Sequence, residues 1–278
     1  MTINIKWLVA ILALPILISA LPAEAQRYPK ELRVATTYTT IESGILGTLL
    51  PEFESRYGIK VHLLVAGTGQ ALKYAESGDV DLTLTHSQLD EERMIASGHS
   101  IERRDVMVSD FVIVGPKDDP ARLRGLHNPA EAFRRIAAGP YTFASRGDRS
   151  GTHQMELRIW QDAKLKPEGS WYLSVGQGMA ETLAVADVKR AYCLSERGTW
   201  LAQKYRFVLD LLVVGEPRIK NQYGVMLVNP QKYSDLNTSA ARQFSDWIVS
   251  AEIQRRIAAY TIGGEQVFFP NARSEVRR

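Results

Sequence analysis

The chain has 278 residues, of which 45% are hydrophobic and 23% are charged, and its formal net charge is +3. This composition is typical of a globular protein and excludes a disordered chain, and so mild a positive excess does not indicate a nucleic-acid partner. The single cysteine, Cys193, excludes an internal disulfide and is expected to be a buried structural thiol.

The N-terminus has the order of a secretory signal. Lys6 precedes an apolar run over residues 7–21, and the small-x-small sequence of residues 23–25 follows it. The run is interrupted by Pro15 and falls short of the roughly 20 apolar residues that a membrane-spanning helix needs. We therefore expect residues 1–25 to be a cleaved signal peptide, and the mature protein to be soluble in the periplasm.

Beyond the signal, short apolar runs rich in β-branched residues alternate with segments of helical periodicity. This pattern is typical of a mostly parallel sheet covered by helices. Strands are expected at residues 32–35, 61–66 and 80–85, and helices around Ile45, Leu49 and Phe53 and around Ala71, Leu72 and Ala75. In such an α/β fold the strand ends direct loops and helix N-termini toward one crevice.

Two later runs, at residues 110–115 and 224–229, are long and apolar and separate segments with the pattern of different α/β units. A mature chain of about 250 residues is too large for one comfortable core. We therefore expect two strand crossings between two lobes, with residues 30–110 plus 225–278 in lobe one and residues 111–224 in lobe two. The alternative is that both strands belong to one continuous sheet.

The segment 144–153 follows a strand expected at residues 141–143 and precedes a helix that contains Trp160. Such a loop can direct backbone N–H groups and the positive end of a helix dipole at an anion. Ser150 and Thr152 add hydroxyl donors, and the planar guanidinium of Arg146 suits two oxygens at once. The alternative interpretation is that the polar residues of this segment only cap a turn and a helix.

Two further segments have equivalent positions, each after a strand and before a helix. They are the hydroxyl-rich run at residues 36–40 and the Gly-Thr-Gly turn at residues 67–69. Three such loops favour a common anion site more strongly than one loop does.

These segments resemble a known family, the periplasmic tungstate-binding proteins of TupA type, which are the substrate-binding components of ABC importers. The matching stretches are residues 34–37, 65–72, 78–81, 110–116, 145–153, 176–179 and 223–225. The resemblance implies a two-lobed α/β periplasmic-binding-protein fold of type II, a tungstate or molybdate ligand and a membrane permease as partner. Carried onto matching positions, it implies these ligand residues: Thr36, Thr37, Thr39, Thr68, Arg146, Ser150 and Thr152.

One position departs from the family pattern. Tyr38 stands where the family has a small hydroxyl residue, and Thr39 stands where it has serine. If the side chain of Tyr38 faces the ligand, it affects the size of the pocket; if it faces away, the change is neutral.

Other functions fit the residues less well. A phosphate- or sulfate-binding receptor and an anion-sensing module for a membrane signalling partner are the alternatives. Phosphate is disfavoured because residues 83–87 hold no carboxylate to accept its proton. Asp148, Ser150 and His153 are too crowded for a hydrolase triad, and no metal-ligand spacing is present, so neither an enzyme nor a metal or other cofactor is expected. We expect a monomer.

Overall fold

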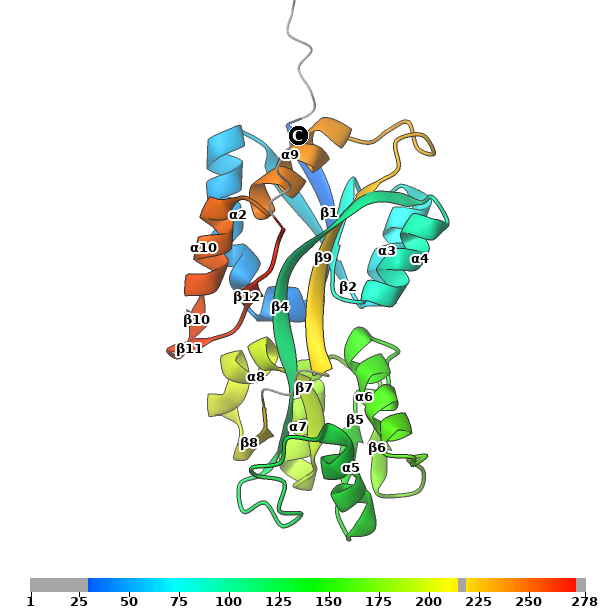
Figure 1. Cartoon of the computed structure of the whole chain (residues 1–278), viewed down its shortest axis with the longest axis vertical. Coiled ribbons are helices and arrows are strands. Elements are labelled where there is room, and N and C mark those ends of the chain that lie inside the picture. Colours follow the sequence, from blue (N-terminus) through cyan, green and yellow to red (C-terminus); the bar gives the residue numbers. More distant parts are fainter. Residues whose placement is uncertain (1–29, 215–218, 274–278) are drawn as a thin grey trace, which may run out of the picture.

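The computed structural model describes residues 30–214 and 219–273. The predicted signal peptide, residues 1–25, lies outside these ranges. Figure 1 shows two lobes arranged along the long axis of the molecule. The long strand β4 (Ser100–Pro116) runs from one lobe into the other, and β9 (Lys220–Val228) pairs with its first part. The chain therefore passes between the lobes along neighbouring strands, at positions that overlap the crossings expected from the sequence.

The central sheet of the described chain is mixed, with the order β12-β4-β9-β3-β1-β2, and β7 and β8 pair with the second part of β4. The other strands of this sheet are β1 (Glu31–Thr37), β2 (Lys60–Ala66), β3 (Leu82–Thr85), β7 (Cys193–Glu196), β8 (Leu209–Val213) and β12 (Phe269–Pro270). Two small sheets are formed by β5 (Phe143–Ser145) with β6 (Tyr172–Ser174) and by β10 (Thr261–Ile262) with β11 (Glu265–Gln266).

The expectation of a mostly parallel sheet was wrong. Strand β1 is parallel to β2 and β3, but β9 joins β3 antiparallel, and β4 is antiparallel to β9, β7, β8 and β12. A parallel pair needs a crossover connection, whereas a chain that leaves one lobe on β4 and returns on β9 naturally runs antiparallel. Strand β4 pairs with other strands in both lobes. The two crossing strands therefore also belong to one continuous hydrogen-bonded sheet, which was the alternative to separate lobes.

Helices cover the sheet and fill the two lobes. In lobe one they are α1 (Tyr38–Glu42), α2 (Ile45–Tyr57), α3 (Thr68–Ser77), α4 (Gln88–Ala96), α9 (Thr238–Ile248) and α10 (Ala251–Ala259). In the other they are α5 (Pro129–Ala138), α6 (Gly151–Asp162), α7 (Met179–Lys189), α8 (Arg197–Gln203) and a 3₁₀ turn at Lys204–Arg206. No helix among the residues described has the length and apolar character needed to cross a membrane.

Local sequence explains where these helices begin and end. The apolar residues of α2 recur on one face and are buried, and Gly58 ends the helix in the left-handed conformation with φ of 65°. At α5, the side chain of Asn128 accepts hydrogen bonds from the first turn, and Pro129 occupies the first helical position, where its missing N–H costs nothing.

Aromatic clusters anchor the core of each lobe. Phe53 packs against Phe244 and Trp247 in lobe one, with ring centroids 5.1 Å apart in both pairs. In lobe two, Trp160 lies 4.3 Å from Phe133. Each such pair contributes about 1 kcal/mol beyond its buried area. Cys193 is fully buried, as expected, and burial raises the pKa of its thiol well above the usual range.

Two buried carboxylates connect segments of lobe one, Asp81 just before β3 and Glu91 beyond its end. Asp81 accepts hydrogen bonds from the backbone N–H groups of Arg33 and Asn237 and pairs with the Arg33 guanidinium at 2.8 Å. Glu91, also buried, accepts from the Thr85 hydroxyl and pairs with Arg103 at 2.9 Å. Glu91 therefore fixes the loop that follows β3, whereas Asp81 ties the starts of β1 and β3 to the residue before α9.

Candidate functional site

A small cavity lies where the loops of the two lobes meet. Its lining contains no carboxylate within the described chain, and its unfilled space is about 10 Å³, roughly that of one water molecule. The residues that line it are Thr37, Tyr38, Thr39, Ala66, Gly67, Thr68, His86, Arg146 and Ser150. The lining residues from Thr37 to His86 belong to lobe one, whereas Arg146 and Ser150 belong to lobe two. The site is therefore complete only when the lobes are together.

Four hydroxyl groups face this cavity, from Thr37, Thr39, Thr68 and Ser150. The Ser150 hydroxyl accepts a hydrogen bond from the backbone N–H of His153, at 3.3 Å, so its own proton remains available to a ligand. Thr37 Oγ1 and Thr39 Oγ1 lie 3.2 Å apart at the junction of β1 and α1. Hydroxyl groups in these positions can donate to an acceptor held in the cavity.

Besides the short helix α1, two longer helices begin at the cavity wall. Gly67 precedes α3, and Ser150 precedes α6. The first-turn N–H groups of a helix have no partner within the helix, and the helix dipole places partial positive charge at this end. The two N-termini, one from each lobe, therefore converge on a place that favours an anion.

Arg146 is the only arginine or lysine in the described lining, and its side chain is 3% exposed. Its Nη1 donates to Thr152 Oγ1 at 3.2 Å and lies 3.5 Å from Glu196 Oε1. Its Nε lies 3.0 Å from Asp148 Oδ2, but this N–H is not aligned for a hydrogen bond. Arg146 is thus held between two carboxylates, which partly neutralise its charge and fix its position.

The structure places two of the predicted ligand residues away from the cavity. The Thr36 hydroxyl donates to the carbonyl of Leu84 at 2.9 Å, on the opposite face of β1 from Thr37. The Thr152 hydroxyl donates to Glu196 and accepts from Arg146. Neither side chain lines the cavity, so in this structure Thr36 holds β1 to β3 and Thr152 positions Arg146. The other five predicted residues, Thr37, Thr39, Thr68, Arg146 and Ser150, surround it together.

The sequence reasoning missed His86, which is 7% exposed and lines the cavity. Its Nε2 lies 3.0 Å from both Thr37 Oγ1 and Thr39 Oγ1. Tyr38, the departure from the family pattern, also borders the cavity, but its side chain remains 48% exposed. A histidine directly after a strand that ends near the threonine run was the signal that could have identified His86.

The arrangement of the Asp148–His153 segment does not form a hydrolytic triad. Asp148 accepts from the backbone N–H of Ser150, and the ring of His153 accepts from the backbone N–H of Arg149. These are turn and cap contacts, and Arg146 and Ser150 of the same segment also line the cavity. Across residues 30–214 and 219–273 no cluster of three or more His, Cys, Asp or Glu side chains could hold a metal ion.

Gly147 controls the shape of the loop that carries Arg146. It has φ of 64°, and a Cβ atom there would lie 2.1 Å from Ser174 Oγ and 3.4 Å from Gly176 N. We predict that Gly147→Ala displaces the loop, lowering the free energy of unfolding by more than the roughly 1 kcal/mol of left-handed strain alone. Urea denaturation and anion titration measure both effects.

Gly58→Ala is the matched control, because Gly58 has φ of 65° and open space around the position of a Cβ. It should show the strain cost alone, with unchanged anion affinity. Equal stability losses in the two variants, with equal affinities, would mean that the contact with Ser174 does not shape the site.

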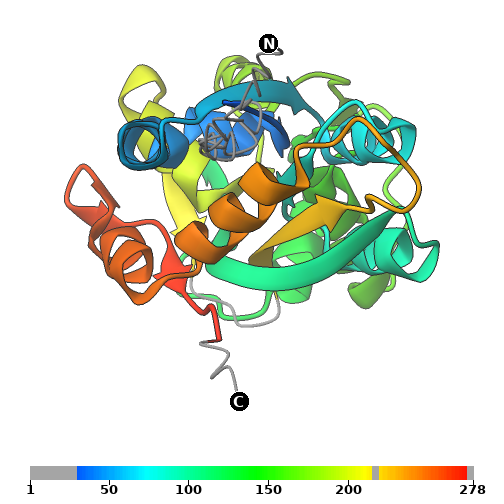
Figure 2. The same ribbon diagram turned by 90° about the horizontal axis from the view of Figure 1, so that it is seen from above.

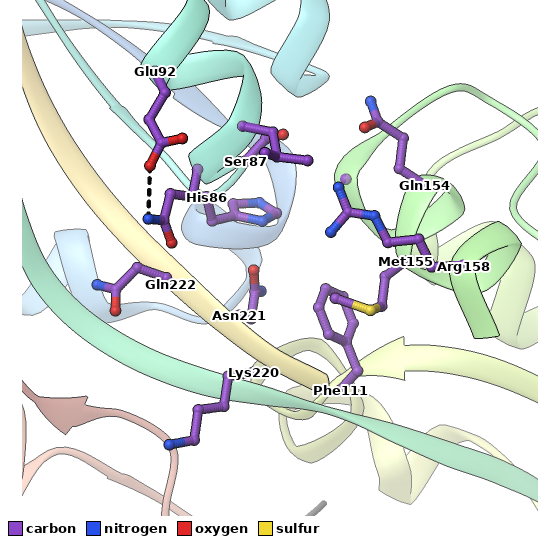
Figure 3. Close-up of a pocket in the computed structure, with 13 residues that line it drawn as sticks. His86, Ser87, Glu92, Phe111, Gln154, Met155, Arg158, Lys220, Asn221 and Gln222 are labelled. Carbon is purple, nitrogen blue, oxygen red and sulfur yellow. Dashed lines mark hydrogen bonds between the residues drawn. The ribbon is translucent and has the colours of Figure 1, made fainter. Parts of the chain in front are cut away.

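A larger cavity of about 350 Å³ lies beside the small one (Figure 3). His86 belongs to the lining of both cavities. The larger cavity extends along the crossing strands, where Phe111 and Asn221 border it, and toward α6, where Gln154 and Arg158 border it. It is the wider part of the cleft between the lobes.

Comparison with known proteins agrees with this architecture. Residues 22–252 match the family model described as the PBP superfamily domain. The tungstate-binding protein TupA of Peptoclostridium acidaminophilum is 42% identical over 243 residues, covering 86% of this chain and 85% of that protein.

Two solved structures are similar as well. The structure of the tungstate ABC transporter from Geobacter sulfurreducens is 42% identical, with a TM-score of 0.78, covering 83% of this chain and 98% of that one. The tungstate-binding protein TupA from Desulfovibrio alaskensis is 36% identical, with a TM-score of 0.77, and the match covers 88% of this chain and 100% of that one. The relatives are binding proteins of transporters, not enzymes. The chain belongs to the PBP superfamily and, within it, to the family of the TupA tungstate-binding proteins of ABC importers.

Proposed function

We propose that this protein captures tungstate, with molybdate as the nearest competitor, in the small cavity between its lobes and delivers it to the permease of an ABC importer. The observation that carries the proposal is the chemistry of the cavity: hydroxyl groups, two helix N-termini and one guanidinium, with no carboxylate among the described residues of the lining. The similarity to tungstate-binding relatives supports the same cargo.

The proposed ligands are the side chains of Thr37, Thr39, Thr68, Arg146 and Ser150. A bare dianion needs donors only, whereas a phosphate that carries a proton also needs an acceptor. Charge-assisted hydrogen bonds contribute roughly 1.5 to 3 kcal/mol each, so a handful supports nanomolar affinity, near −12 kcal/mol, after the costs of desolvation and ordering.

Capture requires movement of the lobes. The remaining space fits about one water molecule, and a tetrahedral oxyanion with four oxygens is larger. The lobes must therefore open about β4 and β9 to admit the anion, and close on it slightly less tightly than they do here. We retain residues 30–110 plus 225–278 as lobe one and residues 111–224 as lobe two, with an exported, monomeric chain that acts in the periplasm after removal of residues 1–25.

Calorimetric titration of the chain from residue 26 onward tests the proposal. Tungstate and molybdate should each bind tightly with one-to-one stoichiometry, and sulfate and phosphate should give no measurable heat under the same conditions. Tighter binding of phosphate than of tungstate, or no binding of any of the four anions, would refute the cargo assigned here.

A further inference from the structure

A row of buried polar groups leads from the crossing strand β9 to the cavity. Asn221, on β9, is 1% exposed, and His86, at the end of β3, is 7% exposed. Asn221 Oδ1, Asn221 Nδ2 and His86 Nδ1 have no well-aligned hydrogen bond within the described chain, although the amide lies close enough to raise the imidazole pKa against the larger, opposite effect of burial. Figure 3 shows the amide of Asn221 directed toward the His86 ring, with its oxygen nearer to the ring than its nitrogen. On its other side, His86 Nε2 meets Thr37 and Thr39.

His86 is held in this position by its surroundings. The ring of Tyr223 packs against it with the centroids 4.9 Å apart. Burial lowers the pKa of His86, so the imidazole is neutral and carries one N–H proton. Which nitrogen carries that proton is decided by the partner of the other nitrogen.

The position of this proton changes what the threonines can offer to a ligand. If the proton is on Nδ1, then Nε2 is an acceptor, and one threonine hydroxyl must donate to it instead of to the anion. If the proton is on Nε2, the imidazole donates to a threonine oxygen, and both threonine protons remain for other acceptors. Thr37 Oγ1 is also within 2.7 Å of Thr40 Oγ1 and accepts from the Thr40 backbone N–H, so it has little accepting capacity left. Thr39 is therefore the natural acceptor for Nε2–H.

We propose that the Asn221 amide turns over so that Nδ2 donates to His86 Nδ1, that His86 then donates from Nε2–H to the threonine pair, and that this relay directs the threonine protons at the bound oxyanion. Asn221 and His86 are positioning residues: they make the cavity a set of donors only and so favour a fully deprotonated dianion over a protonated one. This inference rests on the proposed function and extends it to the origin of selectivity.

The tautomer of His86 can be measured without any ligand. The full chain, labelled with ¹⁵N, is examined by two-bond ¹H–¹⁵N correlation of its five histidine rings, and loss of one set of signals in His86→Gln assigns His86. We expect the Nε2–H form. Observation of the Nδ1–H form overturns the relay whether or not the protein binds tungstate, whereas the Nε2–H form in a chain that binds no oxyanion would refute the proposed function alone.

Asn221→Asp tests the relay through binding. A carboxylate can only accept, so it draws the imidazole proton to Nδ1, the reverse of what an amide permits. At about pH 8.5, where the imidazole of His86 is expected to be neutral, we expect a switched tautomer and a loss of tungstate affinity on the order of tenfold or more, the effect of one lost donor to an anion.

The added negative charge is controlled by Gln222→Glu. Gln222 is the next residue of β9 and borders the same larger cavity, and its side-chain amide donates to the carbonyls of Met107 and Tyr223. The Gln222→Glu variant should lose clearly less tungstate affinity than Asn221→Asp and keep the Nε2–H tautomer of His86. Equal losses in the two variants would mean that charge alone acts, and would overturn the relay.

Discussion

Replacing Arg146 with alanine is expected to weaken tungstate binding on the order of a thousandfold, because truncating one partner of a buried charged contact typically costs 2 to 5 kcal/mol. The side chain is 3% exposed and is the only arginine or lysine in the described lining of the cavity. Its removal leaves the dianion with hydroxyl and backbone donors but no formal positive charge. Calorimetric titration measures the loss, and an unchanged affinity would refute the assignment of Arg146 as a ligand.

The neighbours of Arg146 require a control for stability. Removal of the guanidinium also leaves Glu196, which is 1% exposed, without its cation. The double variant Arg146→Ala with Glu196→Gln should therefore recover unfolding free energy in urea but not tungstate affinity. If affinity returns as well, local charge balance rather than the guanidinium fork holds the anion. Arg158→Ala removes a cation that borders the larger cavity but not the small one, and it should leave tungstate affinity nearly unchanged.

Much of the fold follows from local sequence patterns. The helix expected around Ile45, Leu49 and Phe53 occurs as α2, because an apolar stripe specifies it and Gly58 ends it. The parallel or antiparallel direction of the strands could not be predicted in this way, since a hydrophobic run indicates a strand but not which strand it pairs with. The short helix α1 was also missed, because five residues starting at Tyr38 are too few to show a period.

The three loops of the candidate site could be predicted because each directly follows a strand. Convergence of the three loops is observed, but the resemblance implied both Thr36 and Thr37 as ligands. Successive side chains of a strand point to opposite faces, so neighbouring threonines on β1 could not both face the cavity. His86 could not be assigned in this way, because its role depends on contacts with Thr37, Thr39 and Tyr223, which are distant in sequence.

Replacing Glu156 with glutamine is expected to stabilise the protein at alkaline pH. Glu156, on α6, is 1% exposed and accepts hydrogen bonds from Tyr172 Oη at 2.6 Å and Trp160 Nε1 at 3.2 Å. Burial raises its pKa from 4.5 to about 7, despite these bonds and one from the backbone N–H of Arg146. The carboxyl group that supports the Arg146 loop is therefore protonated in the folded protein under mildly acidic conditions.

A raised pKa means that the folded chain retains a proton that the unfolded chain releases. Between pH 4.5 and about 7 the unfolded state binds fewer protons, so this group's contribution to stability falls as pH rises. At about 1.4 kcal/mol per pKa unit, the loss approaches roughly 3 kcal/mol above pH 7. Glutamine cannot ionise, so urea denaturation should show Glu156→Gln close to the unmodified protein at about pH 5 and more stable at about pH 8.

The exposed residue Glu168, whose side chain is 73% accessible, provides the matched control, and Glu168→Gln should show no such divergence with pH. A constant difference between Glu156→Gln and the unmodified protein at all pH values would indicate a packing effect of the amide rather than ionisation. Ionisation strengthens the hydrogen bond that Glu156 accepts from the Arg146 backbone, since this bond lowers the carboxyl pKa, but it also places a buried negative charge beside the anion loop. Tungstate affinity of the unmodified protein should then decline above about pH 7, while that of Glu156→Gln remains level.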